Sequence, residues 1–218
     1  MIKFRGDENV WITSDTHYSH KNICRGVTDW RMPDGSIPVD QTRNFTTIDK
    51  MNHTIVDNIN EHVGQDDYLI HLGDWSFGGI DKILEFKRRL ICQNIYLICG
   101  NHDDHIVENK HGEKGYFVKV FHDRTTMQYG KSRFVLDHYP IASWREMKKG
   151  VIHLHGHCHL SNQLKFGNGK RMDCGMDGNP EFRPYNLSRE IIPIMDKRTV
   201  ASEMFHDHHT DNMKNIVG

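Results

Sequence analysis

Hydrophobic residues recur at helical spacing in two stretches of the chain. In residues 47–63 the apolar positions recur at the spacing of one helix face, and they are Ile48, Met51, Ile55, Val56, Ile59 and Val63. Thr46 or Thr47 is suited to cap the N-terminus of this helix, and Gly64 follows its C-terminal end. A second helix is predicted over residues 80–90. Both segments have one apolar face, so we expect them to pack on a sheet.

Short apolar runs between polar turns predict the β-strands. In the first half they cover residues 9–14, 67–74 and 94–103, and the helix between the last two indicates a parallel crossover unit. The second half has shorter runs separated by turns such as YGKS and GNGK, which predicts a second, largely antiparallel sheet. These runs are 116–121, 125–129, 133–138, 151–157 and 162–166. The fold class is therefore α/β.

The length of 218 residues predicts a single domain over residues 1–195, followed by a polar tail over 196–218. Near the end of the domain a short helix is expected from Ser188, limited by Pro193. Residues 24–46 contain Gly, Pro and turn pairs without a clear period, which indicates a long loop. Such a loop is either a lid over a substrate site or a plain surface excursion.

The charge balance and the cysteine content indicate which binding partners and which cellular compartment to expect. Lys and Arg number 28 against 29 for Asp and Glu, so no bulk field favours a nucleic acid polymer or an anionic membrane. Five cysteines without a CxxC pair fit reduced thiols better than a disulfide framework. The N-terminus lacks the apolar core of a signal peptide, and no apolar run reaches the ~18 residues of a membrane span. We expect a cytoplasmic protein, in the host cytoplasm if a phage encodes it.

Five apolar runs are each followed by residue types that bind metal ions. The segments are DTH (15–17), GDW (73–75), GNHD (100–103), DHYP (137–140) and GHCH (156–159). One Asp or His after a strand is usually a cap, but their occurrence after five strands indicates a shared site. Oxygen and imidazole ligands without thiolate favour Mn, Fe, Zn, Ni or Co over a structural cysteine–zinc site.

In order and spacing these five segments resemble the motif blocks of the calcineurin-like metallophosphoesterases. The resemblance covers residues 9–160, and SDTHYSHKNI and HLGDWSFGG are similar to the small bacterial and phage members. It implies a four-layer α/β/β/α sandwich in which helices flank two central mixed β-sheets. It also implies two divalent metal ions at the strand ends, with Mn expected first and Fe, Zn, Ni or Co as alternatives.

The resemblance assigns roles residue by residue. One ion would be bound by Asp15, His17 and His159. The other ion would be bound by Asn101, His138 and His157. Asp74 would bridge the two ions, because one short carboxylate can reach both. Two such ions acidify a bridging water and clamp the phosphoryl oxygens during in-line attack by the resulting hydroxide. His102 would act as general acid or stabilise the transition state, with Asp103 orienting its ring.

Four weaker candidates for substrate contact are His20, Asn22, Arg25 and Arg43. The polarity of a loop explains His20 and Asn22 equally well. The two arginines bracket the 24–46 loop and are suited to pair with a phosphate, although a solvated surface position is the commoner outcome for arginine.

The four histidines of the run VIHLHGHCHL are expected to have two different roles. His157 and His159 match the family motif, and strand-like alternation is expected to turn Cys158 away from the metal ions. His153 and His155 lie on the strand itself, where we expect support for the ligands or buried packing.

Other residues near the motifs are expected to support the fold rather than to bind metal ions or substrate. We expect a hydrogen bond to a ligand or simple burial for His71, and core packing rather than stacking on a base for Trp75 and Phe77. Asp173 and Asp177 are assigned no catalytic role.

The sequence thus predicts an enzyme that hydrolyses a phosphodiester of small-molecule or nucleotide type. A phosphomonoesterase acting on a nucleotide, sugar or phosphoprotein would use the same site, so this alternative stays open. A nuclease is less favoured because no basic stripe accompanies the motifs. A non-catalytic scaffold is also less favoured, since every ligand position is filled. The sequence does not specify the natural substrate or the oligomeric state.

Overall fold

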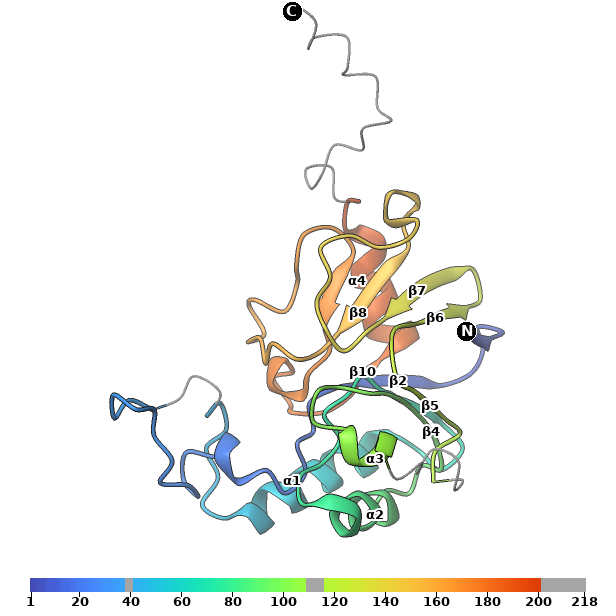
Figure 1. Cartoon of the computed structure of the whole chain (residues 1–218). Helices are drawn as coiled ribbons and strands as arrows, with labels where there is room; N and C mark the ends of the chain where they lie inside the picture. Colours follow the sequence, from blue (N-terminus) through green and yellow to red (C-terminus); the bar gives the residue numbers. More distant parts are fainter. Residues whose placement is uncertain (38–40, 109–115, 201–218) are drawn as a thin grey trace, which may run out of the picture.

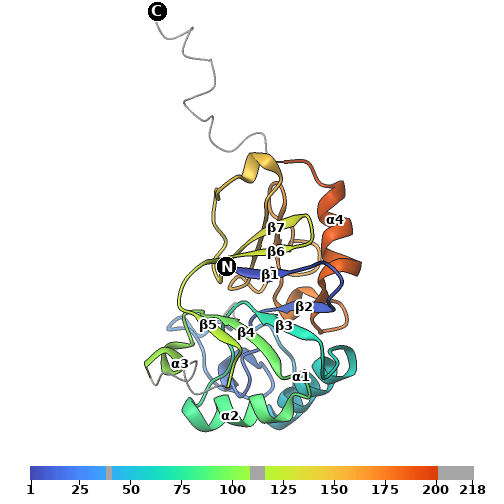
Figure 2. The same cartoon turned by 90° about the vertical axis from the view of Figure 1, so that its right-hand side faces the viewer.

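The structure is a computed structural model that describes residues 1–37, 41–108 and 116–200. Two five-stranded sheets face each other, and helices flank them (Figures 1 and 2). This confirms the predicted α/β class and the two mixed sheets. The single-domain boundary at residue 195 stays a prediction, and most of the expected tail lies outside the described residues.

The first sheet has the strand order β10-β2-β3-β4-β5. Its central strands are parallel neighbours, and β10 pairs antiparallel with β2 at one edge. The strands are β2 (Val10–Thr13), β3 (Tyr68–His71), β4 (Asn94–Ile98), β5 (Lys119–Phe121) and β10 (Tyr185–Asn186). Because β2, β3 and β4 are parallel, the loops that follow them leave the same edge of the sheet.

Helices α1 (Ile48–His62) and α2 (Gly79–Arg89) cover the outer face of this sheet (Figure 2). The side chain of Thr47 caps α1 by accepting a hydrogen bond of 3.1 Å from the Lys50 backbone N–H, as predicted. The predicted apolar stripe of α1 is buried in one core cluster with strands β3 and β4. A third helix, α3 (Asp104–Glu108), begins in the loop after β4.

The second sheet has the order β1-β6-β7-β8-β9, and the prediction that it is largely antiparallel is wrong. Only β6 and β7 pair antiparallel, while the other three pairs are parallel. The strands are β1 (Ile2–Phe4), β6 (Thr125–Tyr129), β7 (Ser132–Leu136), β8 (Ile152–His155) and β9 (Arg171–Asp173). A crossover through residues 137–151 returns the chain, so β7 and β8 point the same way and their following loops share one edge.

Three short segments also differ from the sequence prediction. The run 116–121 contributes β5 to the first sheet, so it does not belong to the second. The run 162–166 is a turn with one isolated bridge from Phe166 to Met172. The helix expected from Ser188 is a π-helical turn (Leu187–Ile191) that continues as α4 (Ile192–Lys197), and Asn186 caps it instead. Asn186 Oδ1 accepts a hydrogen bond of 2.9 Å from the Arg189 backbone N–H.

A second core cluster lies between the sheets, where Ile12, Ile70 and Leu72 share a buried cluster with Leu136 and Leu154. This packing fixes the two sheets against each other and brings their loop-bearing edges together. Across the described ranges, the structure contains no helix long and apolar enough to cross a lipid bilayer.

Candidate metal centre

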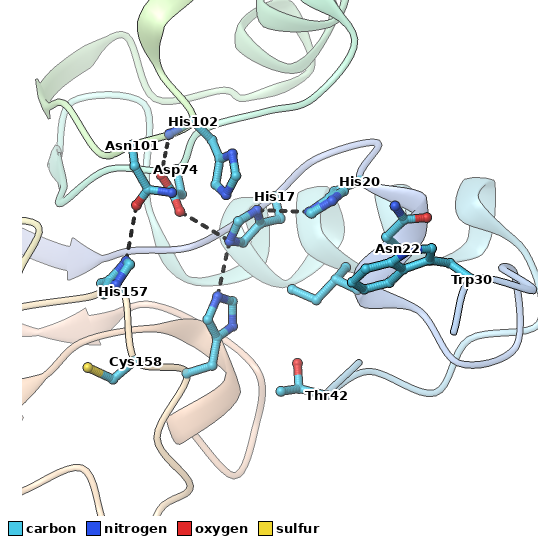
Figure 3. Close-up of a pocket in the computed structure, with 12 residues that line it drawn as sticks. His17, His20, Asn22, Trp30, Thr42, Asp74, Asn101, His102, His157 and Cys158 are labelled. Atoms are coloured by element: carbon cyan, nitrogen blue, oxygen red, sulfur yellow. Dashed lines mark hydrogen bonds and ion pairs between the residues drawn. The ribbon is translucent and has the colours of Figure 1, made fainter. Parts of the chain in front are cut away.

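The loops after four strands line one cavity of about 570 Å³ (Figure 3), and the loop after a fifth strand places His138 beside Asn101 in its wall. The strands are β2, β3, β4, β7 and β8, and the loops carry all nine residues predicted for metal binding and catalysis. Within these loops the structure brings together two groups of ligand atoms, each spanning less than 4.8 Å: Asp15, His17 and His159, and Asp74, His138 and His157.

The first group contains two imidazole rings whose Nε2 atoms face each other. His17 Nε2 lies 3.1 Å from His159 Nε2. The opposite nitrogen of His159, Nδ1, donates to Asp177 Oδ2 at 2.7 Å, so a neutral His159 ring presents the Nε2 lone pair to His17. Two ligands ~2.1 Å from one ion and at right angles to each other lie ~3.0 Å apart. The observed separation therefore fits a shared divalent cation.

The second group surrounds the side-chain oxygen of Asn101. Asn101 Oδ1 lies 3.0 Å from His138 Nε2 and 3.0 Å from His157 Nδ1. His138 Nδ1–H donates to the Leu72 carbonyl at 2.8 Å, which leaves Nε2 to face the centre. The side chains point toward one another in the orientation that metal ligands require.

Asp74 lies between the two groups. Its Oδ2 is 3.4 Å from His17 Nε2 and 3.5 Å from His138 Nε2, so one carboxylate oxygen faces a ligand of each group. Its Oδ1 accepts a hydrogen bond of 3.0 Å from the His102 backbone N–H. Asp74 thus lies between the two groups, and its role as a bridging ligand stays a prediction.

The backbone of the centre is held in an unusual conformation. Five of the predicted ligands have positive φ angles between 47° and 72°: Asp15, His17, Asp74, His157 and His159. Non-glycine residues rarely adopt this left-handed region, and residues that do so cluster at functional sites. Gly156 is required by close approach, because a Cβ atom there would lie 1.9 Å from Ser14 Oγ and 2.4 Å from Asp15 Oδ2.

Burial gives the centre a preference for bound positive charge. Desolvation raises the pKa of Asp15 to about 7, and desolvation also holds the pKa of His17 well below its usual range. A bound cation would stabilise the buried Asp15 carboxylate beside the His17 imidazole, which burial keeps neutral. The donor set, its tautomers and its charge thus all fit divalent metal ions.

Arg43 does not line the cavity, so it is not placed to bind a phosphate there. Its side chain is 3% exposed and its donors are used inside the protein. Nε and one terminal nitrogen bind the two oxygens of Asp177 at 2.9 and 3.0 Å, and the remaining bonds reach the backbone carbonyls of Asp15 and Thr16 and the sulfur of Met51. The prediction that Arg43 pairs with a phosphate is therefore wrong, because no part of the guanidinium is left for a substrate.

Asp177 is a functional neighbour that the sequence did not reveal. It accepts hydrogen bonds from Arg43 on one side and from His159 on the other. Burial alone would raise its pKa, but the Arg43 charge and the His159 bond hold the pKa of Asp177 below its usual range. The carboxylate therefore fixes the tautomer and orientation of His159. Asp177 and Arg43 are 134 residues apart in the sequence, so no local sequence pattern predicts that they pair.

Asp103 supports the loop instead of the His102 ring. Its oxygens accept hydrogen bonds from the backbone N–H groups of Asp74, Trp75 and Gly100 at 2.8, 2.9 and 2.8 Å. The expected contact with the His102 imidazole is thus replaced by three bonds to backbone amides, two of which hold the loop after β4 against the loop after β3. Burial raises the pKa of Asp103 to about 6 against the lowering effect of these bonds.

The remaining substrate-contact candidates divide into two sets. His20 and Asn22 line the cavity, and the His20 ring stacks on Phe77 with 3.7 Å between centroids and 4° between planes. Arg25 is exposed and does not line the cavity. The proposed lid segment 24–46 contributes Trp30 and Thr42 to the wall, both of which sequence reasoning missed, and its residues 38–40 lie outside the described residues.

His71, His153 and His155 are buried, as predicted, whereas Cys158 is exposed and lines the cavity. His71 and His153 are fully buried and His155 is nearly so; His71 forms a 2.9 Å hydrogen bond with Thr16 Oγ1. Trp75 is fully buried in the core. The Cys158 sulfur lies in a group with His155 and Asp173, outside both predicted metal groups, and Figure 3 draws it pointing away from Asn101.

Comparison with known proteins agrees with this geometry. Residues 8–194 match the family model described as calcineurin-like phosphoesterase. The chain is 27% identical over 196 residues to the uncharacterized protein MJ1445 of Methanocaldococcus jannaschii, covering 88% of this chain and 94% of that protein. It is 26% identical over 207 residues to the gene 66 protein of Mycobacterium phage D29, covering 84% and 96%.

A solved structure shows the same fold. The crystal structure of AQ665, a protein of unknown function from Aquifex aeolicus, superposes with a TM-score of 0.58 at 21% identity. The match covers 86% of this chain and 100% of that chain. At this level of identity the likeness concerns the fold alone.

Proposed function

Because the chain belongs to the calcineurin-like phosphoesterases, a family of metal-dependent phosphoester hydrolases, we propose that it hydrolyses a phosphodiester at a dinuclear metal centre. The position of Asp74 Oδ2 between the two ligand groups carries this proposal. Asp15, His17 and His159 would hold one ion, and Asn101, His138 and His157 the other. The oxygen and imidazole donors favour Mn²⁺ first, with Fe, Zn, Ni or Co as alternatives.

Two bound ions would supply an acidified water as nucleophile and neutralise charge on the phosphoryl oxygens. The protein's own contribution beyond the ligands is made by His102. The backbone N–H of His102 is fixed on Asp74 Oδ1, and the exposed imidazole lines the cavity beside the ring of Phe77 with 4.8 Å between centroids. We assign this imidazole the transfer of a proton to the leaving oxygen.

A second cavity favours a diester over a monoester. This cavity of about 180 Å³ shares Asn101 and His102 with the larger one and continues past Phe77 toward Asp104 and His105. A phosphodiester carries two organic substituents, and the two cavities offer a place for each. A monoester has one substituent and an additional negative charge, whereas neither of the arginines predicted to bind phosphate reaches the cavity.

The proposal is tested by comparing bis-p-nitrophenyl phosphate with p-nitrophenyl phosphate in the presence of Mn²⁺. The proposed function predicts a higher kcat/KM for the diester. A higher kcat/KM for the monoester would establish the alternative phosphomonoesterase, and failure to hydrolyse either compound would favour a scaffold.

A further inference from the structure

The larger cavity extends beyond the ligands to a wall that contains one aromatic residue, Trp30. Ile23, at the end of the short helix Lys21–Ile23, lines this part together with Asn22, Trp30 and Thr42. Figure 3 draws Asn22 and Trp30 on the other side of His17 and His20 from the ligands of the second group. The cavity is therefore longer than a phosphate group requires, and its far end has different chemistry from the centre.

Trp30 is held by its backbone while its ring stays accessible. Its carbonyl accepts a hydrogen bond of 3.0 Å from Gln41, which is itself 3% exposed, and its N–H donates to Thr28 Oγ1 at 3.2 Å. The residue as a whole is nevertheless 44% exposed. A tryptophan fixed at a cavity wall with an accessible ring is suited to stack on a planar ligand.

The neighbours of Trp30 combine an apolar surface with polar groups. Ile23 is buried and adds apolar surface to the wall. The Thr28 hydroxyl donates to Asn22 Oδ1 at 3.0 Å, which leaves the Asn22 amide nitrogen as the donor end of that side chain. The Thr42 hydroxyl donates to Asp177 Oδ1 at 3.3 Å, so its oxygen can accept. A flat group with donors and acceptors on its edge matches this wall better than an alkyl chain.

We propose that this wall binds the base of a nucleoside phosphodiester, with the base stacked on Trp30 and its edge toward Asn22 and Thr42. This inference rests on the proposed phosphodiesterase function, because it assigns one ester substituent to this end of the cavity. The substrate class is then a diester of a nucleotide, and Trp30 is a specificity residue of the same site.

Two substrates with the same leaving group test the inference. Thymidine 5′-(p-nitrophenyl phosphate) carries a base and methyl p-nitrophenyl phosphate does not. Trp30→Ala is expected to lower the ratio of kcat/KM for the thymidine ester to that for the methyl ester by about 5- to 150-fold, the range of stacking on one base. Trp30→Phe keeps a ring and should retain most of the ratio. Met32→Ala is the matched control, since Met32 is 43% exposed on the same loop and does not line the cavity.

A binding measurement separates this inference from the proposed function. Thymidine lacks a phosphate, so titrating it into the metal-free protein probes the wall alone. The indole N–H signal of Trp30, identified by its absence in Trp30→Phe, should shift in the ¹H–¹⁵N spectrum, while deoxyribose should leave it unchanged. No shift with thymidine, or an unaltered substrate ratio in Trp30→Ala, would overturn the inference. If wild type hydrolyses neither ester, the proposed function fails while the titration still decides the stacking.

Discussion

Asp177→Asn should weaken one metal site of the centre and spare the other. The substitution keeps the shape of the side chain but removes the charge that pairs with Arg43 and accepts from His159 Nδ1 at 2.7 Å. Asp177 Oδ1 accepts from Arg43 Nε and Oδ2 accepts from both Arg43 and His159, so in either orientation the introduced asparagine places its amide N–H₂ against the guanidinium. The asparagine can therefore no longer hold both partners as the carboxylate does, and a neutral amide oxygen is a weaker acceptor for His159 Nδ1–H than a carboxylate oxygen.

The structure sets the size of the two effects. Arg43 is 3% exposed and would lose its only carboxylate partner in the described contacts, and breaking such a buried pair costs about 3 to 5 kcal/mol of unfolding free energy. Loss of the residue that orients a metal-binding histidine typically lowers metal affinity ~10- to 100-fold, which is ~1.4 to 2.8 kcal/mol. This loss should fall on the site of Asp15, His17 and His159.

Urea unfolding of the metal-free protein and calorimetric titration with Mn²⁺ measure the two effects separately. We expect a lower unfolding free energy and one weakened site beside one site of wild-type affinity. Glu190→Gln is the matched control, because Glu190 binds Arg183 through two bonds of 3.0 Å and is not part of the centre. It should lower stability without changing Mn²⁺ affinity. Two wild-type sites in Asp177→Asn, or equal losses in both variants, would refute the reasoning.

Further predictions concern catalysis and stability. His102→Ala should keep both ions and lose ~10²- to 10⁴-fold in kcat, whereas His157→Ala should lose metal occupancy; metal analysis and initial rates distinguish the two. Burial lowers the pKa of His153 from 6.5 to about 4, and its Nε2 accepts from the Ile141 N–H at 3.3 Å. Because the unfolded chain takes up the proton first, His153 should contribute a loss of ~2 kcal/mol of stability between pH 7 and pH 5. Urea unfolding should show a shallower fall in His153→Gln.

Much of the fold follows from periodicity in the sequence. The α1 helix was predicted from its apolar spacing, and its Thr47 cap from residue type. Strands β1 and β9 have three residues each, too few for a period to be detected. The direction of β8 was also missed, because a buried apolar run has the same pattern in parallel and antiparallel sheets and only the crossover decides.

The candidate ligands were predictable because each follows an apolar strand, whereas their supporting residues were not. Asp103 was placed correctly in the loop after β4, but its bonds to three backbone amides depend on how two loops approach each other. Arg43 and Asp177 are 134 residues apart, so only the folded chain shows that the two charges are buried together. Trp30 was missed because its aperiodic loop gives no indication of which side chains face the cavity.

The central claim is that Asp74 joins two metal sites into one hydrolytic centre. Its most direct test is to measure bound Mn²⁺ and hydrolysis of bis-p-nitrophenyl phosphate on the same samples of wild type and Asp74→Ala. The account predicts two ions per wild-type chain with Mn²⁺-dependent hydrolysis, and loss of both the second ion and the activity in the variant. Wild-type hydrolysis by Asp74→Ala, or no hydrolysis by wild type loaded with two ions, would contradict it.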